Sequence, residues 1–285
     1  MCSLGQLAAC LGAALLSVSA HAHAACVWKA TGPNGGTVYL GGSIHALRSV
    51  DYPLPPAYNQ AFDAASRIAF EVDEKTLNAT TKALFKGGQY SRGDSLRNHV
   101  DPRTYDYVRR VFALMNVSEE KFAKYRPWFL VLMLQSPQSH GLSESGVDDF
   151  LLKRARRNSK PVSGLETANE HVAVYSGLTD RQAEALLIFT FIPQERSTGE
   201  EMPWMRAWRK GDADTIARMM HAGYRDYPAF AERLLGARNR RWIPKIEDYV
   251  RSGHTYFVVA GAAHFGGPDG VLSLLRQRGY SIVQL

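Results

Sequence analysis

The segment that most constrains the fold is residues 255–260, a continuous run of apolar side chains (TYFVVA). A short apolar run of this kind is typical of a β-strand that is buried on both faces. The chain continues directly into Gly261-Ala262-Ala263-His264, so a histidine stands just beyond the carboxyl end of the predicted strand. The run therefore predicts a central strand of a sheet. It also places His264, a residue that can bind a metal or transfer a proton, at the edge of that sheet.

Other segments predict the remaining elements of the fold. The strand-like segments are residues 26–30, 37–41, 67–72, 161–166 and 280–283, and Asn34-Gly35 between the first two is a hairpin signal. Helical patterns cover residues 55–66, 102–115, 126–135, 147–157, 180–191, 212–222, 229–250 and 268–278. No linker divides residues 25–285. We therefore expect one α/β (α+β) domain with a central mixed sheet and a large helical insertion.

Acid–base residues follow four of the predicted strands. They are His45, Glu71 with Asp73, Glu166, and His264. In open α/β sheets, ligands bind outside the carboxyl ends of the strands, so these side chains converge if the strands are parallel. Two imidazoles with one or two carboxylates are sufficient to hold a divalent ion such as Zn²⁺, Mn²⁺ or Co²⁺ and leave a position for water.

Each of these residues also has a purely structural interpretation. Glu71 and Asp73 are placed to stabilise the first turn of the next helix. The remaining histidines have no acid at a ligand spacing, and we expect them to be exposed or hydrogen-bonded; they include His99, His140, His171, His221 and His254. The sequence lacks a His-Glu-x-x-His helix, a Gly-x-Ser-x-Gly elbow and both glycine-rich nucleotide motifs, which excludes the corresponding enzyme classes.

Residues 1–24 predict a secretory signal peptide. An apolar segment at 7–18 is followed by Ala20-His21-Ala22-His23-Ala24, which offers small residues at the cleavage positions. The segment before it has no Lys or Arg, so an uncleaved anchor and a lipid anchor stay open as alternatives. Cleavage after Ala24 predicts a periplasmic or secreted protein without a stable membrane span. It also leaves Cys26 as the single cysteine, which we expect to be buried.

The charge of the chain favours no particular partner. The formal net charge is +7, and basic residues cluster at 153–160 on a predicted helix and its exit. This cluster has no interleaved aromatic residues, so a solvated helix face is favoured over nucleic-acid binding. We therefore expect a peptide or small-molecule substrate and no nucleic acid.

Several blocks of the sequence, taken in order, resemble the TraB/PrgY/GumN family, in particular its bacterial GumN-like branch. The blocks are Gly42-Ser43-Ile44-His45, Phe70-Glu71-Val72-Asp73, Gly164-Leu165-Glu166-Thr167, Arg238-Asn239-Arg240-Arg241-Trp242 and Gly261-Ala262-Ala263-His264-Phe265. The resemblance implies a fold like that of erythromycin esterase and ChaN. It also implies a metal-dependent hydrolase, with proteolysis as the activity ascribed to the Tiki relatives.

Carried onto this chain, the resemblance implies a metal site. The two Gly-x-x-His histidines fall on His45 and His264, and the strand-end glutamate falls on Glu71. These three residues are then the expected ligands of Mn²⁺, Co²⁺ or Zn²⁺. Asp73 is the expected partner that orients one of the histidines.

The resemblance also implies a catalytic group. Its second glutamate falls on Glu166, the expected general base for a bound water. Its arginine falls on Arg240 or Arg241, which would stabilise an oxyanion or bind a substrate carboxylate. Two alternatives remain: a non-catalytic protein that binds a ligand, a peptide, or haem or iron in the same cleft, and an interaction protein in which these charges only cap helices.

Overall fold

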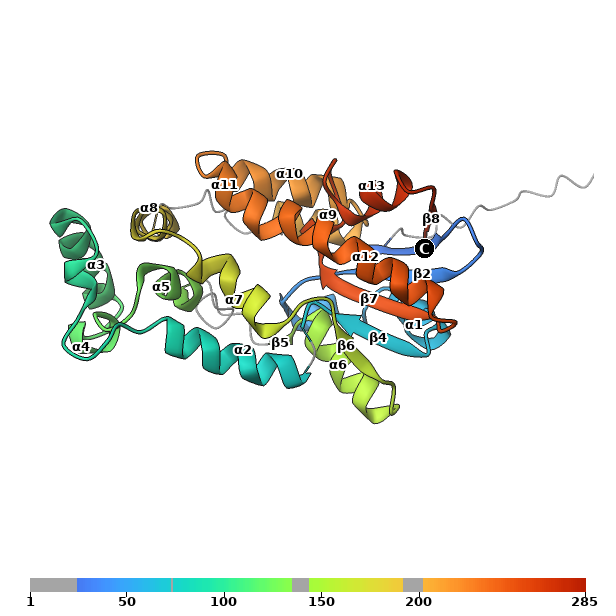
Figure 1. Cartoon of the computed structure of the whole chain (residues 1–285), viewed down its shortest axis with the longest axis horizontal. Coiled ribbons are helices and arrows are strands. Elements are labelled where there is room, and N and C mark those ends of the chain that lie inside the picture. Colours follow the sequence, from blue (N-terminus) through green and yellow to red (C-terminus); the bar gives the residue numbers. More distant parts are fainter. Residues whose placement is uncertain (1–24, 73, 135–143, 192–201) are drawn as a thin grey trace, which may run out of the picture.

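The structure is a computed structural model that describes residues 25–72, 74–134, 144–191 and 202–285. The predicted signal peptide and Asp73 lie outside the described residues. A six-stranded sheet fills one end of the molecule, and a group of helices fills the other (Figure 1). The strands are β1 (Val27–Thr31), β2 (Thr37–Ser43), β4 (Arg67–Phe70), β6 (Val162–Gly164), β7 (Tyr256–Gly261) and β8 (Ser281–Gln284).

The strand order in the sheet is β6-β4-β7-β2-β1-β8. Strands β6, β4, β7 and β2 are mutually parallel, whereas β1 is antiparallel to both β2 and β8. The expected mixed sheet is therefore confirmed. Because Ser43 pairs with Gly261 and Phe70 pairs with Gly164, the carboxyl ends of the four parallel strands lie at the same rim. The residues that follow these strands are thus brought together.

Strand β7 lies inside the sheet, and the residues in its middle are buried, as its apolar run predicts. At the same rim, the end of β2 is fixed by two buried donors from helices. The Tyr58 hydroxyl donates to the Gly42 carbonyl over 2.5 Å, and the Trp208 indole donates to it over 2.9 Å. These bonds hold the backbone just before His45.

The helices surround two hydrophobic cores. Those that pack on or near the sheet are α1 (Pro56–Ala64), α6 (Val147–Arg157), α9 (Pro203–Arg209), α10 (Ala213–Gly223), α12 (Ala237–Arg251) and α13 (Val271–Arg276). The second core lies among the helices at the other end: α2 (Glu74–Gly87), α3 (Pro102–Leu114), α4 (Glu119–Phe122), α5 (Pro127–Leu134), α7 (Ala168–Ser176), α8 (Asp180–Thr190) and α11 (Pro228–Ala231). This second group is the expected helical insertion.

One helical run joins the two cores. Helix α11, a π-helical turn (Glu232–Gly236) and α12 follow one another without a break, which confirms the helix predicted over 229–250. Phe230 at one end packs in the helical core, and Trp242 packs in the sheet core. The π-turn was not predicted, because no residue pattern in this segment signals it. Such turns occur frequently at functional sites.

Two further findings concern membrane-spanning helices and the cysteine. None of the helices in the described part of the chain is both long and apolar enough to cross a bilayer. Cys26 is a free cysteine and is fully buried, as expected. Burial raises the pKa of its thiol, so the residue packs in the core as a small apolar side chain.

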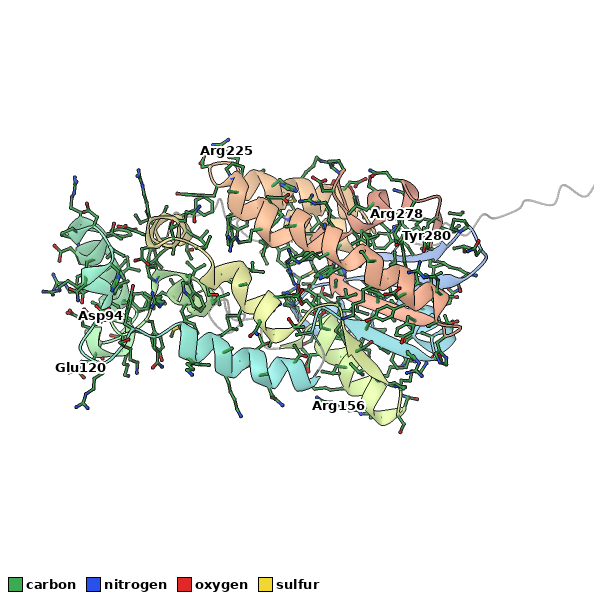
Figure 2. The ribbon with its side chains drawn as sticks, viewed as in Figure 1. Asp94, Glu120, Arg156, Arg225, Arg278 and Tyr280 are labelled. Atoms are coloured by element: carbon green, nitrogen blue, oxygen red, sulfur yellow. The ribbon has the colours of Figure 1, made fainter. Side chains whose placement is uncertain are left out.

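A bridging histidine ties two segments of the helical end together. His99 Nε2 lies 2.8 Å from an Asp94 oxygen, and its Nδ1 lies 3.2 Å from an Asp180 oxygen at the start of α8. Its ring stacks on Tyr90, with 4.3 Å between centroids, and the Arg126 guanidinium lies over Tyr90. Asp94 lies toward the α3–α4 end of the molecule (Figure 2). No spacing in the sequence indicates this bridge, because Asp94 and Asp180 are distant from each other in the chain.

We expect this bridge to make stability depend on pH. The hydrogen bond from His99 to Asp94 raises the pKa of the histidine above its ordinary 6.5. A raised pKa contributes stability that is complete below the unfolded value and is lost as the pH rises through the folded value. The difference in unfolding free energy between the wild type and His99→Gln should therefore be largest below pH 6.5 and shrink as the pH rises through the raised pKa of His99. Urea unfolding at several pH values measures it.

The matched control for the bridge is His254→Gln. His254 is exposed and contacts Arg67 rather than a carboxylate. Its replacement removes an exposed histidine without breaking a histidine–carboxylate bond, so it measures the effect of losing a surface histidine alone. A stability difference for His99→Gln that does not vary with pH would contradict the role of the bridge.

Candidate active site

Three of the four strand ends deliver their side chains to one buried cluster. Glu71 follows β4, Glu166 follows β6 and His264 follows β7. The Glu166 amide donates to the Glu71 carbonyl over 2.9 Å, which extends the pairing of β4 and β6 past the strand ends. The Gly261 amide donates to a Glu71 side-chain oxygen over 2.9 Å. Glu71 therefore faces the rim of the sheet. A residue that only stabilised the first turn of the next helix would not need this contact with Gly261.

Arg238 stands at the centre of this cluster. It lies in the first turn of α12, which packs along β7 and β2 (Figure 1). Its Nη2 lies 2.5 Å from both a Glu71 oxygen and a Glu166 oxygen, and its Nε donates to the second Glu166 oxygen over 3.1 Å. Its Nη1 reaches His264 Nε2 at 3.1 Å and the Leu234 carbonyl at 3.3 Å. The guanidinium thus contacts both carboxylates and the imidazole.

These contacts fix the charges of the two glutamates. Burial by itself raises the pKa of Glu71, but the Arg238 guanidinium outweighs it and holds that pKa well below its ordinary value. Burial also opposes ionisation of Glu166, yet hydrogen bonds from His171 and Arg238 lower its pKa. Both side chains are therefore carboxylates, which share one buried arginine.

His264 is held in a single neutral tautomer. Its Nδ1 lies 2.6 Å from the Asn239 side-chain oxygen, while the Asn239 amide nitrogen donates to the Asp269 carbonyl. Nδ1 therefore carries the proton, and Nε2 presents its lone pair toward Arg238. Burial and the neighbouring guanidinium lower the pKa of His264 to about 3. The ring packs on Trp242, with 4.4 Å between centroids.

Glu166 has a donor on every lone pair. One oxygen accepts from Arg238 Nη2 and from His171 Nδ1 at 2.6 Å. The other accepts from Arg238 Nε and from the Trp242 indole at 3.3 Å. Only 2% of the Glu166 side chain is exposed. A carboxylate has about four acceptor positions, so none remains for a water in this arrangement.

His45 stands at the outer side of the same rim. It follows β2, and its side chain is 73% exposed. Its Nδ1 lies 3.2 Å from an Asp148 oxygen at the start of α6, and this hydrogen bond raises the pKa of His45 to about 9. Gly146 lies against the His45 and Ile44 carbonyls so closely that a β-carbon there would come within 2.5 Å of them. The charge of Glu71 acts on His45, but among the described residues His45 makes no hydrogen bond or ion pair with the buried cluster.

The arginine in the cluster differs from the expected one. Arg240 is exposed and pairs with Glu232 and Asp269, and Arg241 is exposed as well. The residue that reaches the carboxylates is Arg238, two and three positions earlier in the same helix. The oxyanion or substrate role was expected at Arg240 or Arg241, whereas the arginine that contacts the carboxylates is Arg238. The role expected for Asp73 cannot be assigned, since that residue lies outside the described ones.

The donor set fits a divalent metal ion in its chemistry. Among the described residues, Glu71, Glu166 and His171 offer ligand atoms that all lie within 4.8 Å of one another. His264 adds an imidazole with its Nε2 lone pair free of a proton, 3.9 Å from a Glu71 oxygen. Arg238 holds the same atoms of Glu71 and His264. An ion at these two residues would therefore have to replace guanidinium hydrogen bonds.

Comparison with known proteins identifies a family for this chain. The model of the TraB/PrgY/gumN family matches residues 26–284. The chain belongs to the TraB/PrgY/gumN family. The resemblance found in the sequence is thus confirmed, and the site lies at residues that several of its motif blocks contain.

Relatives within the TraB/PrgY/gumN family are distant. The protein named Metalloprotease TIKI1 of Danio rerio is 24% identical over 298 residues, which is 86% of this chain and 60% of that protein. Human Metalloprotease TIKI1 is also 24% identical, and the chain spans 59% of its length. YbaP of Escherichia coli is 24% identical over 251 residues, 86% of this chain and 89% of YbaP. No solved structure gave a significant match.

Proposed function

We propose that this protein is a metal-dependent hydrolase that cleaves peptide bonds at the rim of the sheet. One observation carries the proposal: four polar and charged side chains, Glu71, Glu166, Arg238 and His264, meet in a largely buried cluster beyond the ends of parallel strands. Burying so many ionisable groups is costly for folding, and such clusters concentrate at functional sites. The relatives named metalloproteases support hydrolysis of peptides as the reaction.

Each side chain has a role in this proposal. Glu71 and His264, with His45 at the outer side, would hold Mn²⁺, Co²⁺ or Zn²⁺. The metal, when bound, supplies a Lewis acid that polarises a carbonyl and acidifies water. Asn239 keeps the proton on Nδ1 of His264, which leaves Nε2 available. Arg238 balances the charge of the two carboxylates, which would otherwise face each other in the cluster.

Metal analysis and a cleavage assay test the proposal together. Purified protein would be analysed for bound Mn, Co and Zn, and then incubated with a mixture of quenched fluorescent peptides with and without a chelator. We expect about one ion per chain and cleavage that the chelator stops and added metal restores. A protein that binds metal or haem and cleaves none of the peptides would support the non-catalytic alternative instead.

We also propose that the chain is exported by its first 24 residues. The apolar segment at 7–18 and the small residues before Ala25 support this proposal. N-terminal sequencing of protein isolated from the periplasm or the medium tests it. We expect the sequence to begin at Ala25, and a chain that starts at Met1 in the cytoplasm would refute it.

A further inference from the structure

Glu166 was expected to be the general base, but its surroundings argue against that role. Two donors from Arg238, one from Trp242 and one from His171 fill its acceptor positions. A base must present a free lone pair to the water that it deprotonates. To accept a proton from water, Glu166 would first have to lose one of these buried bonds, and the partner would then be left unpaired.

His171 has the free lone pair that Glu166 lacks. Its Nδ1 lies 2.6 Å from a Glu166 oxygen, so the carboxylate holds the proton on Nδ1. Its Nε2 has no hydrogen-bond partner within the described parts of the chain, and 26% of the side chain is exposed. The ring is thus fixed on one side by a buried carboxylate and open on the other.

The start of α7 fixes the position of this ring. Thr167 caps the helix and forms a capping box with Glu170, in which each side chain bonds the backbone of the other. The His171 amide donates to the Thr167 carbonyl over 3.0 Å. His171 therefore lies in the first turn of α7, directly beyond the strand end that carries Glu166.

We propose that His171 is the catalytic acid–base residue of this site and that Glu166 is the positioning residue that orients it. The inference rests on the proposed hydrolase function. His171 Nε2 takes a proton from water as the water oxygen bonds to the scissile carbonyl carbon. The same proton then passes to the amide nitrogen as the carbon–nitrogen bond breaks. The products are a carboxylic acid and an amine, and the imidazole returns to its neutral form.

This assignment also separates His171 from the metal. In this assignment Nδ1 of the ring keeps the proton that bonds Glu166, so it is not a metal ligand. As an acid–base group, it uses Nε2 and leaves the metal content unchanged. The two roles therefore predict different results for the same variant.

The test compares His171→Gln with His221→Gln, an exposed histidine on α10. With the fluorescent peptides, we expect kcat of His171→Gln to fall by about 10²–10⁴-fold, with unchanged KM and unchanged metal content. Added imidazole should restore part of the activity of His171→Gly. Wild-type turnover in His171→Gln, or loss of its metal, would overturn the assignment.

A second measurement does not depend on turnover. Nitrogen NMR of histidine-labelled protein should show His171 with its proton on Nδ1, and Glu166→Gln should weaken that preference. A resting ring that carries its proton on Nε2 would overturn the proposal. Absence of cleavage by the wild type would instead refute the hydrolase function, so the two failures are distinguishable.

Discussion

The Arg238→Ala variant is expected to unfold with about 3–5 kcal/mol less free energy than the wild type. The change removes the cation that pairs with Glu71 and Glu166 and leaves two buried carboxylates facing each other. It also leaves His264 Nε2 without its donor. Urea unfolding of chelator-treated protein, followed by tryptophan fluorescence, measures the loss.

Arg240→Ala is the matched control for this prediction. Arg240 lies two residues later in the same helix, and its side chain is 47% exposed. An exposed ion pair contributes about 0–1 kcal/mol, so its replacement should change stability little. Arg238→Lys keeps the charge but loses the planar fork, and we expect an intermediate loss. Equal stabilities for the Arg238 and Arg240 variants would show that the buried network does not form as described.

Replacing His264 with alanine should reduce peptide cleavage by at least about 10²-fold and should lower the metal content. The variant removes the one imidazole whose Nε2 lone pair is held toward Glu71 and Arg238. His254→Ala, near the start of the same strand on the exposed side, should retain activity and metal. Cleavage of the peptide mixture and elemental analysis of both variants measure the effect.

A substitution at Asn239 tests the role of His264 in a second way. Replacing Asn239 with leucine removes the acceptor of the Nδ1 proton, so the tautomer of His264 is no longer fixed. Loss of such a partner commonly costs about 10–100-fold in metal affinity or activity. If His264→Ala kept both its metal and its turnover, the reaction centre would have to lie elsewhere.

The strand ends were predictable from the sequence, because the apolar run before His264 and the short segments before Glu71 and Glu166 are strand-like; the structure shows that these strands are parallel. Their side chains then had to meet at one rim. His45 follows the same rule, yet its side chain points to solvent and Asp148. After β2 the chain turns into β3 (Ala46–Leu47), which pairs with β5 (Glu144–Ser145), and no local pattern signals this pairing.

The periodicity of α12 distinguishes Arg238, which contacts the carboxylates, from the expected Arg240 and Arg241. Trp242, Ile243 and Ile246 are buried on α12, and the positions one turn before the first two are 238 and 239. Helical periodicity thus places Arg238 and Asn239 on the buried face, with Arg240 and Arg241 on the solvent side. The signal was present in the spacing of the apolar residues.

His171 was missed for a different reason. It lies five residues after Glu166, which is neither a strand spacing nor a helix spacing, so the contact depends on the turn between β6 and α7. The Thr167-x-x-Glu170 box marks where that helix begins and offers the only local clue to the placement of the ring.

The unbroken run from α11 through the π-turn to α12 makes the cluster sensitive to remote packing. Phe230 is anchored among the distal helices, and eight residues later Arg238 sits between the glutamates. A residue packed in the distal core and the arginine of the cluster thus belong to one continuous helical element. We expect a substitution that loosens the distal helices to displace a guanidinium whose hydrogen-bonding hydrogens are all in use, and to change the balance of charge at the rim.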